Sequence, residues 1–172
     1  MNRKILFNCV RPCPCGYSES DQKPCTCAPA VVTKYQKRIS GPLLDRIDIH
    51  IEVPRVDYEK LSGDRVGETS DAIRSRVQAA RNIQNQRFSK NGSSDIVCNA
   101  DMRVGEISQF CRVGDEGQRL MQAAMTQLNL SARAYHRILK LARTIADLAG
   151  SEEIQSVHLA EALQYRPKLM LN

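Results

Sequence analysis

The chain is organised around one segment, Arg38-Ile-Ser-Gly-Pro-Leu-Leu-Asp-Arg-Ile-Asp-Ile-His-Ile-Glu-Val-Pro54. Apolar and polar side chains alternate over residues 47–53, and the apolar ones are β-branched, which predicts a strand that stops at the proline. Arg46 stands between a Leu-Leu anchor and this predicted strand, so we expect its backbone to be held rigidly and its side chain to point out of the domain. The alternative is that Arg46 merely pairs with Asp45 or Asp48.

A loop rich in cysteine precedes this segment. Four of the seven cysteines form two Cys-x-Cys pairs, Cys13 with Cys15 and Cys25 with Cys27, among prolines and a glycine that prevent regular structure. Four local thiols could hold one Zn²⁺ tetrahedrally as a structural site, because no position would remain for water. Zinc sites typically place about two to four residues between paired ligands, whereas this loop places one. A solvated hairpin with free thiols is the open alternative.

The chain from Thr69 onward shows the apolar periodicity of helices. Thr69 or Ser70 is expected to cap the first of them, and Asp115 to cap a later one. A short helix is predicted within residues 102–111. The first helix also carries basic side chains on its polar face, which we expect to be solvated rather than to contact phosphates. These are Arg74, Arg76, Arg81 and Arg87.

The clearest helix is predicted to begin after its N-cap, Ser131, and to end at Gly150. Ser156 is expected to cap the last helix, over residues 157–165. The apolar content of 42% is enough to give these helices a core of their own. The fold class predicted is therefore mainly α, with a bundle of about four to five helices.

Composition narrows the range of functions. Lys and Arg number 25 against 19 Asp and Glu, and the net charge of +6 suits a polyanionic partner as well as an ordinary soluble surface. Tryptophan is absent and aromatic residues make up 5%, which argues against base stacking as the main mode of nucleic-acid binding. We find no run of about 18 apolar residues and no secretory signal, so we expect a cytoplasmic protein with no membrane partner.

Three parts of the chain together resemble one family. Ser-Gly-Pro-Leu-Leu-Asp-Arg-Ile-Asp-Ile-His, residues 40–50, resembles the arginine-finger segment of AAA+ ATPases in the magnesium-chelatase and MCM-helicase branch. Pro12-Cys-Pro-Cys-Gly-Tyr17 with Cys25-Thr-Cys27 resembles the Cys loop of the ComM/YifB competence-protein family of magnesium-chelatase-like ATPases. Residues 130–150 and 158–166 resemble that family's C-terminal helical domain. The motifs keep the family's order from Arg11 onward, so the chain is identified as a member.

The phosphate-binding motif of such ATPases does not occur in these 172 residues. The sequence has no Gly-x-x-x-x-Gly-Lys-Ser/Thr loop and no apolar strand that ends in an acidic pair for Mg²⁺. The resemblance implies a C-terminal fragment of the α/β AAA+ core over residues 1–65 and a helical lid over 66–172. We expect no ATP hydrolysis by this chain alone, and ATP with Mg²⁺ only together with the N-terminal part. A strand predicted over residues 5–10 leads to Arg11, where the family has a sensor asparagine, and a helical turn is predicted over 58–61.

The resemblance also implies roles for two arginines. Arg46 would be the arginine finger, acting in trans on the nucleotide of the neighbouring subunit. Arg133, in the first turn after Ser131, matches the sensor that reaches from the lid to the γ-phosphate of its own subunit. The implied function is a hexameric, ATP-driven ring that remodels DNA by branch migration during natural transformation. Its implied partners are further copies of itself, its own N-terminal ATPase core and DNA.

Two other functions stay open. One is a non-enzymatic zinc-binding nucleic-acid module, in which the Cys loop docks on DNA and the helices are scaffold. The other is a magnesium-chelatase ATPase subunit, whose ring drives metal insertion into a porphyrin. The Cys-Pro-Cys-Gly sequence of the loop argues against the chelatase.

Overall fold

The computed structural model describes residues 11, 13–18, 23–38, 40, 43, 46–53, 56, 67–90 and 95–166. The chain divides into two compact units, Met1–Leu44 and Asp45–Asn172, and each is described by itself. The strand predicted over residues 5–10 and the turn predicted over 58–61 lie outside the described residues. None of the described helices has the length and apolar character that crossing a bilayer requires.

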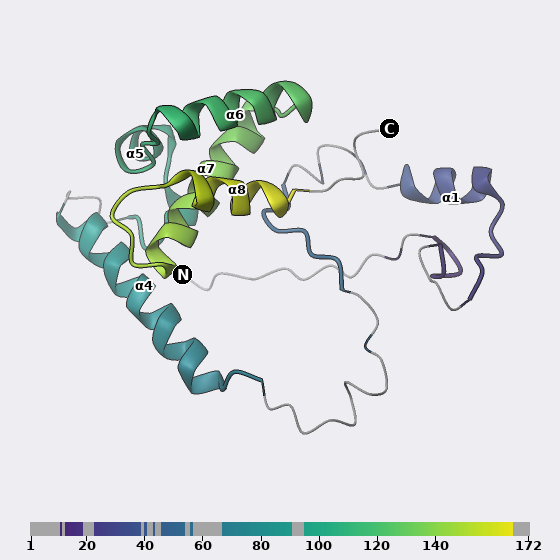
Figure 1. The fold of residues 1–172 in the computed structure, drawn as a ribbon, viewed down its shortest axis with the longest axis horizontal. Helices are drawn as coiled ribbons and strands as arrows, with labels where there is room; N and C mark the ends of the chain where they lie inside the picture. Colours follow the sequence, from purple (N-terminus) through teal and green to yellow (C-terminus); the bar gives the residue numbers. More distant parts are fainter. Residues whose placement is uncertain are drawn as a thin grey trace. The chain divides into compact units, whose positions relative to one another are not determined.

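The described chain is mainly helical, as predicted. In the first unit, helix α1 (Pro29–Gln36) starts with a proline, whose missing N–H costs nothing at a helix start. An isolated parallel bridge joins Val113 to Ile154 in the second unit. The helices of the second unit are α4 (Ser70–Lys90), the 3₁₀ turn η1 (Asn99–Asp101), α5 (Val104–Phe110), α6 (Asp115–Gln127), α7 (Ala132–Leu148) and α8 (Ser156–Gln164) (Figure 1).

Helix α7 is the centre of the second unit. It packs against α8, α4, α5 and η1, while α6 packs against α8 (Figure 1). Ile138, Ala142 and Ala146 are buried at helical spacing along its apolar face. We call residues 67–166 the lid, because their core lies entirely within them. The other core residues are Phe88, Ile96, Met102, Ile107, Cys111, Met121, Leu139, Ile154, Leu159 and Ala162.

Three predicted helix ends are confirmed. The side-chain oxygen of Thr69 accepts a hydrogen bond from the N–H of Ala72 at 3.3 Å. The side-chain oxygen of Ser131 accepts one from the N–H of Ala134 at 3.1 Å, as an N-cap does. Gly150 follows α7 with a φ of +69°, the left-handed conformation that glycine adopts readily after a helix.

Two predicted caps are wrong by one residue. Asp115 is the first residue inside α6, where its negative charge favours the helix N-terminus without capping it. Ser156 is likewise the first residue inside α8. The N–H of Gln155, just before that helix, donates to Nδ1 of the buried His158 at 3.1 Å. A side chain within the first turn therefore satisfies the helix start, as in a capping box.

The strand predicted over residues 47–53 is wrong. These residues are described, and they form neither a ladder nor a helix. A strand needs a neighbouring strand for its backbone hydrogen bonds, and the described part of the chain contains none. Ile51 and Val53 remain 69% and 83% exposed. Alternation of side chains alone therefore does not make a strand of this segment.

A buried polar network joins α4 and η1 to α7. Asp147 accepts hydrogen bonds from both Nη atoms of Arg87, one of them at 2.9 Å. It also accepts from Nε of Arg143 at 3.1 Å and from the amide of Asn99 at 2.7 Å. The carboxylate is completely buried, and Arg87 is only 14% exposed. The prediction that Arg87 is solvated is therefore wrong, because α7 supplies a buried anion at its position.

The other arginines of that predicted face are exposed. Arg74 pairs with Asp71 and Arg76 pairs with Glu68, both on the surface. Exposed pairs of this kind contribute about 0–1 kcal/mol, because water screens them. For these side chains the prediction of a solvated face is confirmed.

Candidate functional site

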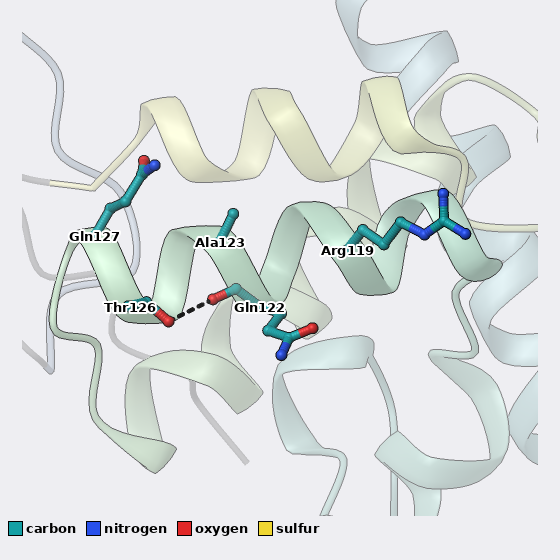
Figure 2. Close-up of a pocket in the computed structure, with 5 residues that line it drawn as sticks. All are labelled: Arg119, Gln122, Ala123, Thr126 and Gln127. Atoms are coloured by element: carbon teal, nitrogen blue, oxygen red, sulfur yellow. Dashed lines mark hydrogen bonds between the residues drawn. The ribbon is translucent and has the colours of Figure 1, made fainter.

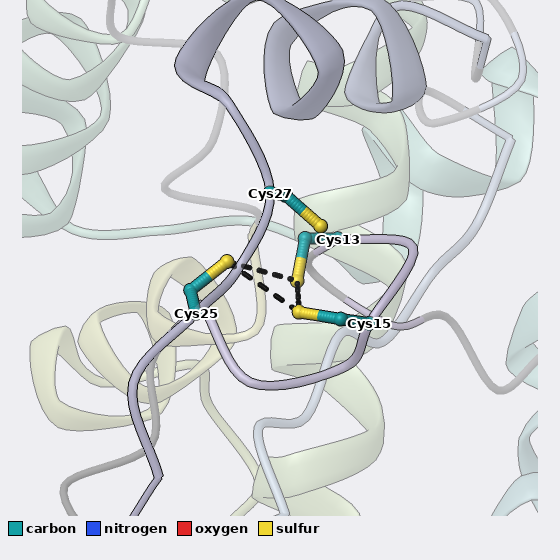
Figure 3. A group of neighbouring side chains, drawn as sticks. All are labelled: Cys13, Cys15, Cys25 and Cys27. Carbon is teal, nitrogen blue, oxygen red and sulfur yellow. Dashed lines mark hydrogen bonds between the residues drawn. The ribbon is translucent and has the colours of Figure 1, made fainter.

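The four cysteines of the predicted metal site come together in the first unit (Figure 3). The sulfur of Cys13 lies 3.3 Å from that of Cys15 and 3.7 Å from that of Cys25, and the latter two are 3.5 Å apart. With Cys27 included, all four sulfurs lie within 4.8 Å of one another. A tetrahedral zinc site with Zn–S bonds of about 2.3 Å separates its sulfurs by about 3.8 Å, so the cluster has the dimensions of such a site.

A tight turn explains how so short a loop gathers the sulfurs. The N–H of Gly16 donates to the carbonyl of Cys13 at 3.0 Å, and Gly16 has a φ of +81°, which glycine adopts without strain. The second pair, Cys25 and Cys27, leads directly into α1. The one-residue spacing, which argues against zinc in the sequence, therefore does not keep the sulfurs apart.

The thiols of the cluster differ in acidity. The pKa of Cys15 is lowered to about 6, first by the backbone N–H of Tyr17 and then by the thiol of Cys13. The pKa of Cys25 is raised to about 12, because the backbone N–H of Cys27 lowers it less than the neighbouring thiols and desolvation together raise it. Near neutral pH Cys15 of the metal-free cluster is therefore largely a thiolate. Four soft sulfur donors with no open position suit a structural zinc ion rather than a catalytic one.

Arg46, the expected finger, belongs to the second unit, and its side chain is exposed. Its backbone carbonyl accepts a hydrogen bond from Nη1 of Arg137 at 2.6 Å. The same nitrogen pairs with the carboxylate of Asp48, so α7 rather than Arg46 engages this aspartate. The other predicted partner, Asp45, lies outside the described residues.

The chain next to Arg46 is attached to the lid at further points. We call residues 46–50 the finger segment. Nη1 of Arg166 donates to the carbonyl of Ile47 at 3.3 Å, and the N–H of His50 donates to the carbonyl of Tyr165 at 2.9 Å. Arg166 is buried, and its Nη2 also donates to the carbonyl of Ala134 in α7 at 3.3 Å. Contacts with α7 and with the end of α8 thus hold this backbone, for which the described residues provide no neighbouring strand.

Arg133, the expected sensor, lies in the first turn of α7 and is exposed. A cation at this end of a helix is disfavoured by about 0.3–1 kcal/mol, and a bound phosphate would reverse that sign. The structure brings Arg133 and the finger segment into one unit, connected through α7. The Cys cluster belongs to the other unit.

Two arginines of this region, Arg137 and Arg166, are not singled out by the sequence. Arg137 has a signal that could have found it, because it follows Arg133 by four residues and so lies on the same side of the helix. Arg166 has none, because its partners are backbone carbonyls 119 and 32 positions away in the chain.

A hollow on α6 offers no comparable chemistry. Figure 2 shows its lining side chains on one helix, and Oγ1 of Thr126 donates to the carbonyl of Gln122 at 3.1 Å. The lining contains no carboxylate, thiol or imidazole. Its residues are Arg119, Gln122, Ala123, Thr126 and Gln127.

Both parts of the chain match family models of the magnesium chelatase subunit ChlI. Residues 67–166 match the family described as magnesium chelatase, subunit ChlI C-terminal, and residues 2–61 match magnesium chelatase, subunit ChlI. The chain is 40% identical to competence protein ComM of Haemophilus influenzae over 168 residues, which are 96% of this chain and 31% of the relative. It is 38% identical to the uncharacterized protein YifB of Escherichia coli over 162 residues, 94% of this chain and 30% of the relative. The chain therefore spans about a third of the length of these relatives.

Proposed function

The chain belongs to the magnesium chelatase ChlI-like family, in the group of ComM and YifB, and we propose that it forms the lid-bearing C-terminal part of an AAA+ ATPase. Because the chain spans only about a third of its relatives, ATP hydrolysis and DNA remodelling are proposed for the whole protein. In this proposal ATP and Mg²⁺ bind to the N-terminal part. This chain supplies Arg46 in trans and Arg133 in cis.

The observation that carries the proposal is the placement of Arg46. Its side chain is exposed, while its own carbonyl and that of Ile47 are bonded to guanidinium groups of the lid. A group that stabilises a transition state is most effective when it is already in place, because it then costs no reorganisation during the reaction. An exposed arginine on an anchored backbone supports the role of a finger that neutralises charge on the transferred phosphoryl group.

The partners and the metal follow from the same assignment. A finger that acts in trans requires a neighbouring subunit, and we propose that the subunits form a hexameric ring in the cytoplasm. The competence name of the Haemophilus influenzae relative and the net charge of +6 support DNA as the substrate of the ring. The Cys13, Cys15, Cys25 and Cys27 cluster would hold a structural zinc ion that gives the short loop its cohesion.

A second candidate is a zinc-binding nucleic-acid module without enzymatic activity. The four-sulfur cluster favours it, because the cluster lies in a compact unit separate from the lid. In a zinc-binding module the anchoring of the finger segment would have no function. In the proposed ATPase both the anchored finger segment and the Cys cluster have one. The two candidates differ in whether turnover of ATP depends on Arg46.

The test uses a hybrid protein in which these 172 residues replace the matching part of Haemophilus influenzae ComM. Arg46→Ala should lower ATP turnover by roughly a thousandfold, at the low end of the range for arginine fingers. ATP binding should stay nearly unchanged, because the finger acts on the nucleotide of the neighbouring subunit. Arg119→Ala, on the exposed side of α6, is the matched control and should keep full turnover.

Mixing experiments check that Arg46 acts across a subunit boundary. Arg46→Ala hybrids mixed with hybrids whose phosphate loop is disabled should regain part of the lost turnover, since each supplies what the other lacks. Full turnover in rings made only of the Arg46→Ala hybrid would refute the finger and favour the zinc module.

A further inference from the structure

Arg137 of α7 holds the backbone of Arg46 directly. Its Nη1 donates to the carbonyl of Arg46 at 2.6 Å and also pairs with the carboxylate of Asp48. One nitrogen thus bridges two groups on either side of Ile47. This contact fixes the course of the chain at the point from which the side chain of Arg46 projects.

Burial indicates that this contact orients the chain more than it stabilises the fold. The side chain of Arg137 is 27% exposed and that of Asp48 is 60% exposed, so water screens the pair. Arg137 is not one of the residues that form the apolar core of the lid. A variant without the contact should therefore still fold, with the finger segment less firmly held.

Helix α7 carries Arg133 and Arg137 one turn apart on the same side. The first is the residue proposed to contact the nucleotide of its own subunit, and the second holds the residue proposed to act on the next subunit. The opposite face of α7 is packed in the core, where Ala142 and Ala146 are completely buried. A displacement of the lid would therefore move both arginines together.

We propose that Arg137 is a positioning residue for Arg46. Through this contact the lid determines how far Arg46 extends toward the neighbouring subunit. This inference rests on the proposed function of Arg46. Without Arg137, Arg46 is still present but its carbonyl loses its donor. Since misplacing a reacting group by about 1 Å costs on the order of a hundredfold in rate, loss of this contact should affect turnover rather than ATP binding.

The first experiment measures kcat and KM for ATP in the hybrid. Arg137→Met keeps the aliphatic stem and removes the donors, and it should lower kcat roughly 10- to 100-fold. KM should change by less than about twofold, as expected when only the transition state is affected. Arg137→Lys keeps a charged donor and should regain part of the turnover. Arg119→Met is the control and should behave as the unsubstituted hybrid.

A double variant separates the positioning role from the finger itself. If Arg137 acts through Arg46, the hybrid with both Arg46→Ala and Arg137→Met should be no slower than the Arg46→Ala hybrid. An additive loss, or a normal kcat in Arg137→Met, would overturn the positioning role and leave the finger intact. Normal turnover in Arg46→Ala would overturn the finger and, with it, this inference.

Arg137→Gln keeps the test decisive if circular dichroism shows that the methionine variant is unfolded. The shorter neutral side chain cannot bridge the carbonyl and the carboxylate, so we expect the same fall in kcat with KM unchanged. A folded Arg137→Gln hybrid with normal kcat would overturn the proposal.

Discussion

Replacing Asp147 by alanine is expected to destabilise the lid strongly. Its carboxylate is completely buried and accepts hydrogen bonds from Arg87, Arg143 and Asn99. Alanine would leave two guanidinium groups, 14% and 3% exposed, without the anion they share. Removing one partner of a buried charge pair costs about 3–5 kcal/mol, because an uncompensated charge then stays away from water.

That loss is large for a domain of this size, because domains typically unfold at a cost of about 5–15 kcal/mol. For a domain of about 100 residues, each kcal/mol lowers the melting temperature by about 4 °C. We therefore expect the melting temperature of the Asp147→Ala chain to fall by about 12–20 °C. The measurement is far-UV circular dichroism of the 172-residue chain during heating, with a urea titration to check that the m-value is unchanged.

Asp71→Ala is the matched control. Asp71 also pairs with an arginine, Arg74 of α4, at 2.7 Å, but the two side chains are 88% and 75% exposed. Its loss should cost less than about 1 kcal/mol. Replacing Asp147 by leucine and both Arg87 and Arg143 by methionine should recover much of the stability, because this network then contains no buried charge. Equal losses for the two single alanine variants would refute the reasoning, since burial is the difference on which it depends.

Three further measurements concern the Cys loop and the lid. The chain made with zinc available should contain about one equivalent of Zn²⁺ by elemental analysis, and Cys25→Ser should abolish it; less than about a tenth of an equivalent in folded, reduced protein would reject the site. In the metal-free chain, iodoacetamide should modify Cys15 far faster than Cys111 near neutral pH. Cys15 has a pKa of about 6 and is a thiolate above pH 6, whereas burial raises the pKa of Cys111 to about 12. The rate at Cys15, followed by peptide mass spectrometry, should fall as the pH falls through about 6, and equal rates at the two thiols would contradict the assignment. A fragment of residues 67–172 should melt cooperatively as a helical domain, because its core lies within it, whereas a disordered spectrum would show that the lid depends on the preceding residues.

The parts that the sequence predicts well are those decided by neighbours along the chain. Ser131 and Gly150 bound α7 because capping and left-handed glycine are local effects. The four cysteines meet because the loop between them is short and turns at Gly16. In each case the interacting residues are close together in the sequence, so the local residue pattern is enough to predict the contact.

The parts that the sequence does not predict depend on distant partners. The alternation over residues 47–53 is typical of a strand, but the described chain gives it no neighbouring strand, and the lid holds it instead. Arg87 looks like another surface arginine of α4, yet Asp147, 60 residues later, draws it into the core. Residue type and periodicity on a single helix carry no information about which carboxylate lies opposite.

Two arginines of helix α7, Arg143 and Arg137, each bind both a backbone carbonyl oxygen and a carboxylate. Their different burial decides how strongly each arrangement stabilises the structure. Arg143 donates to the carbonyls of Ser151 and Glu152 at 2.6 and 2.7 Å and shares Asp147, with only 3% of its side chain exposed. Breaking that arrangement leaves buried charge and costs about 3–5 kcal/mol, so it holds the loop after α7 in one arrangement.

Arg137 also binds a carbonyl and a carboxylate, but Asp48 is 60% exposed, and an ion pair with an exposed carboxylate contributes about 0–1 kcal/mol. A contact of several kcal/mol would keep the finger segment in one arrangement in nearly every molecule, whatever nucleotide was bound. A contact near 1 kcal/mol can be made or lost when a ligand binds two arrangements of the lid with modestly different affinities. The weakness of the pair between Arg137 and Asp48 is therefore what suits it to follow the nucleotide state in the proposed ATPase, whereas the buried pair between Arg143 and Asp147 is suited only to holding the lid together.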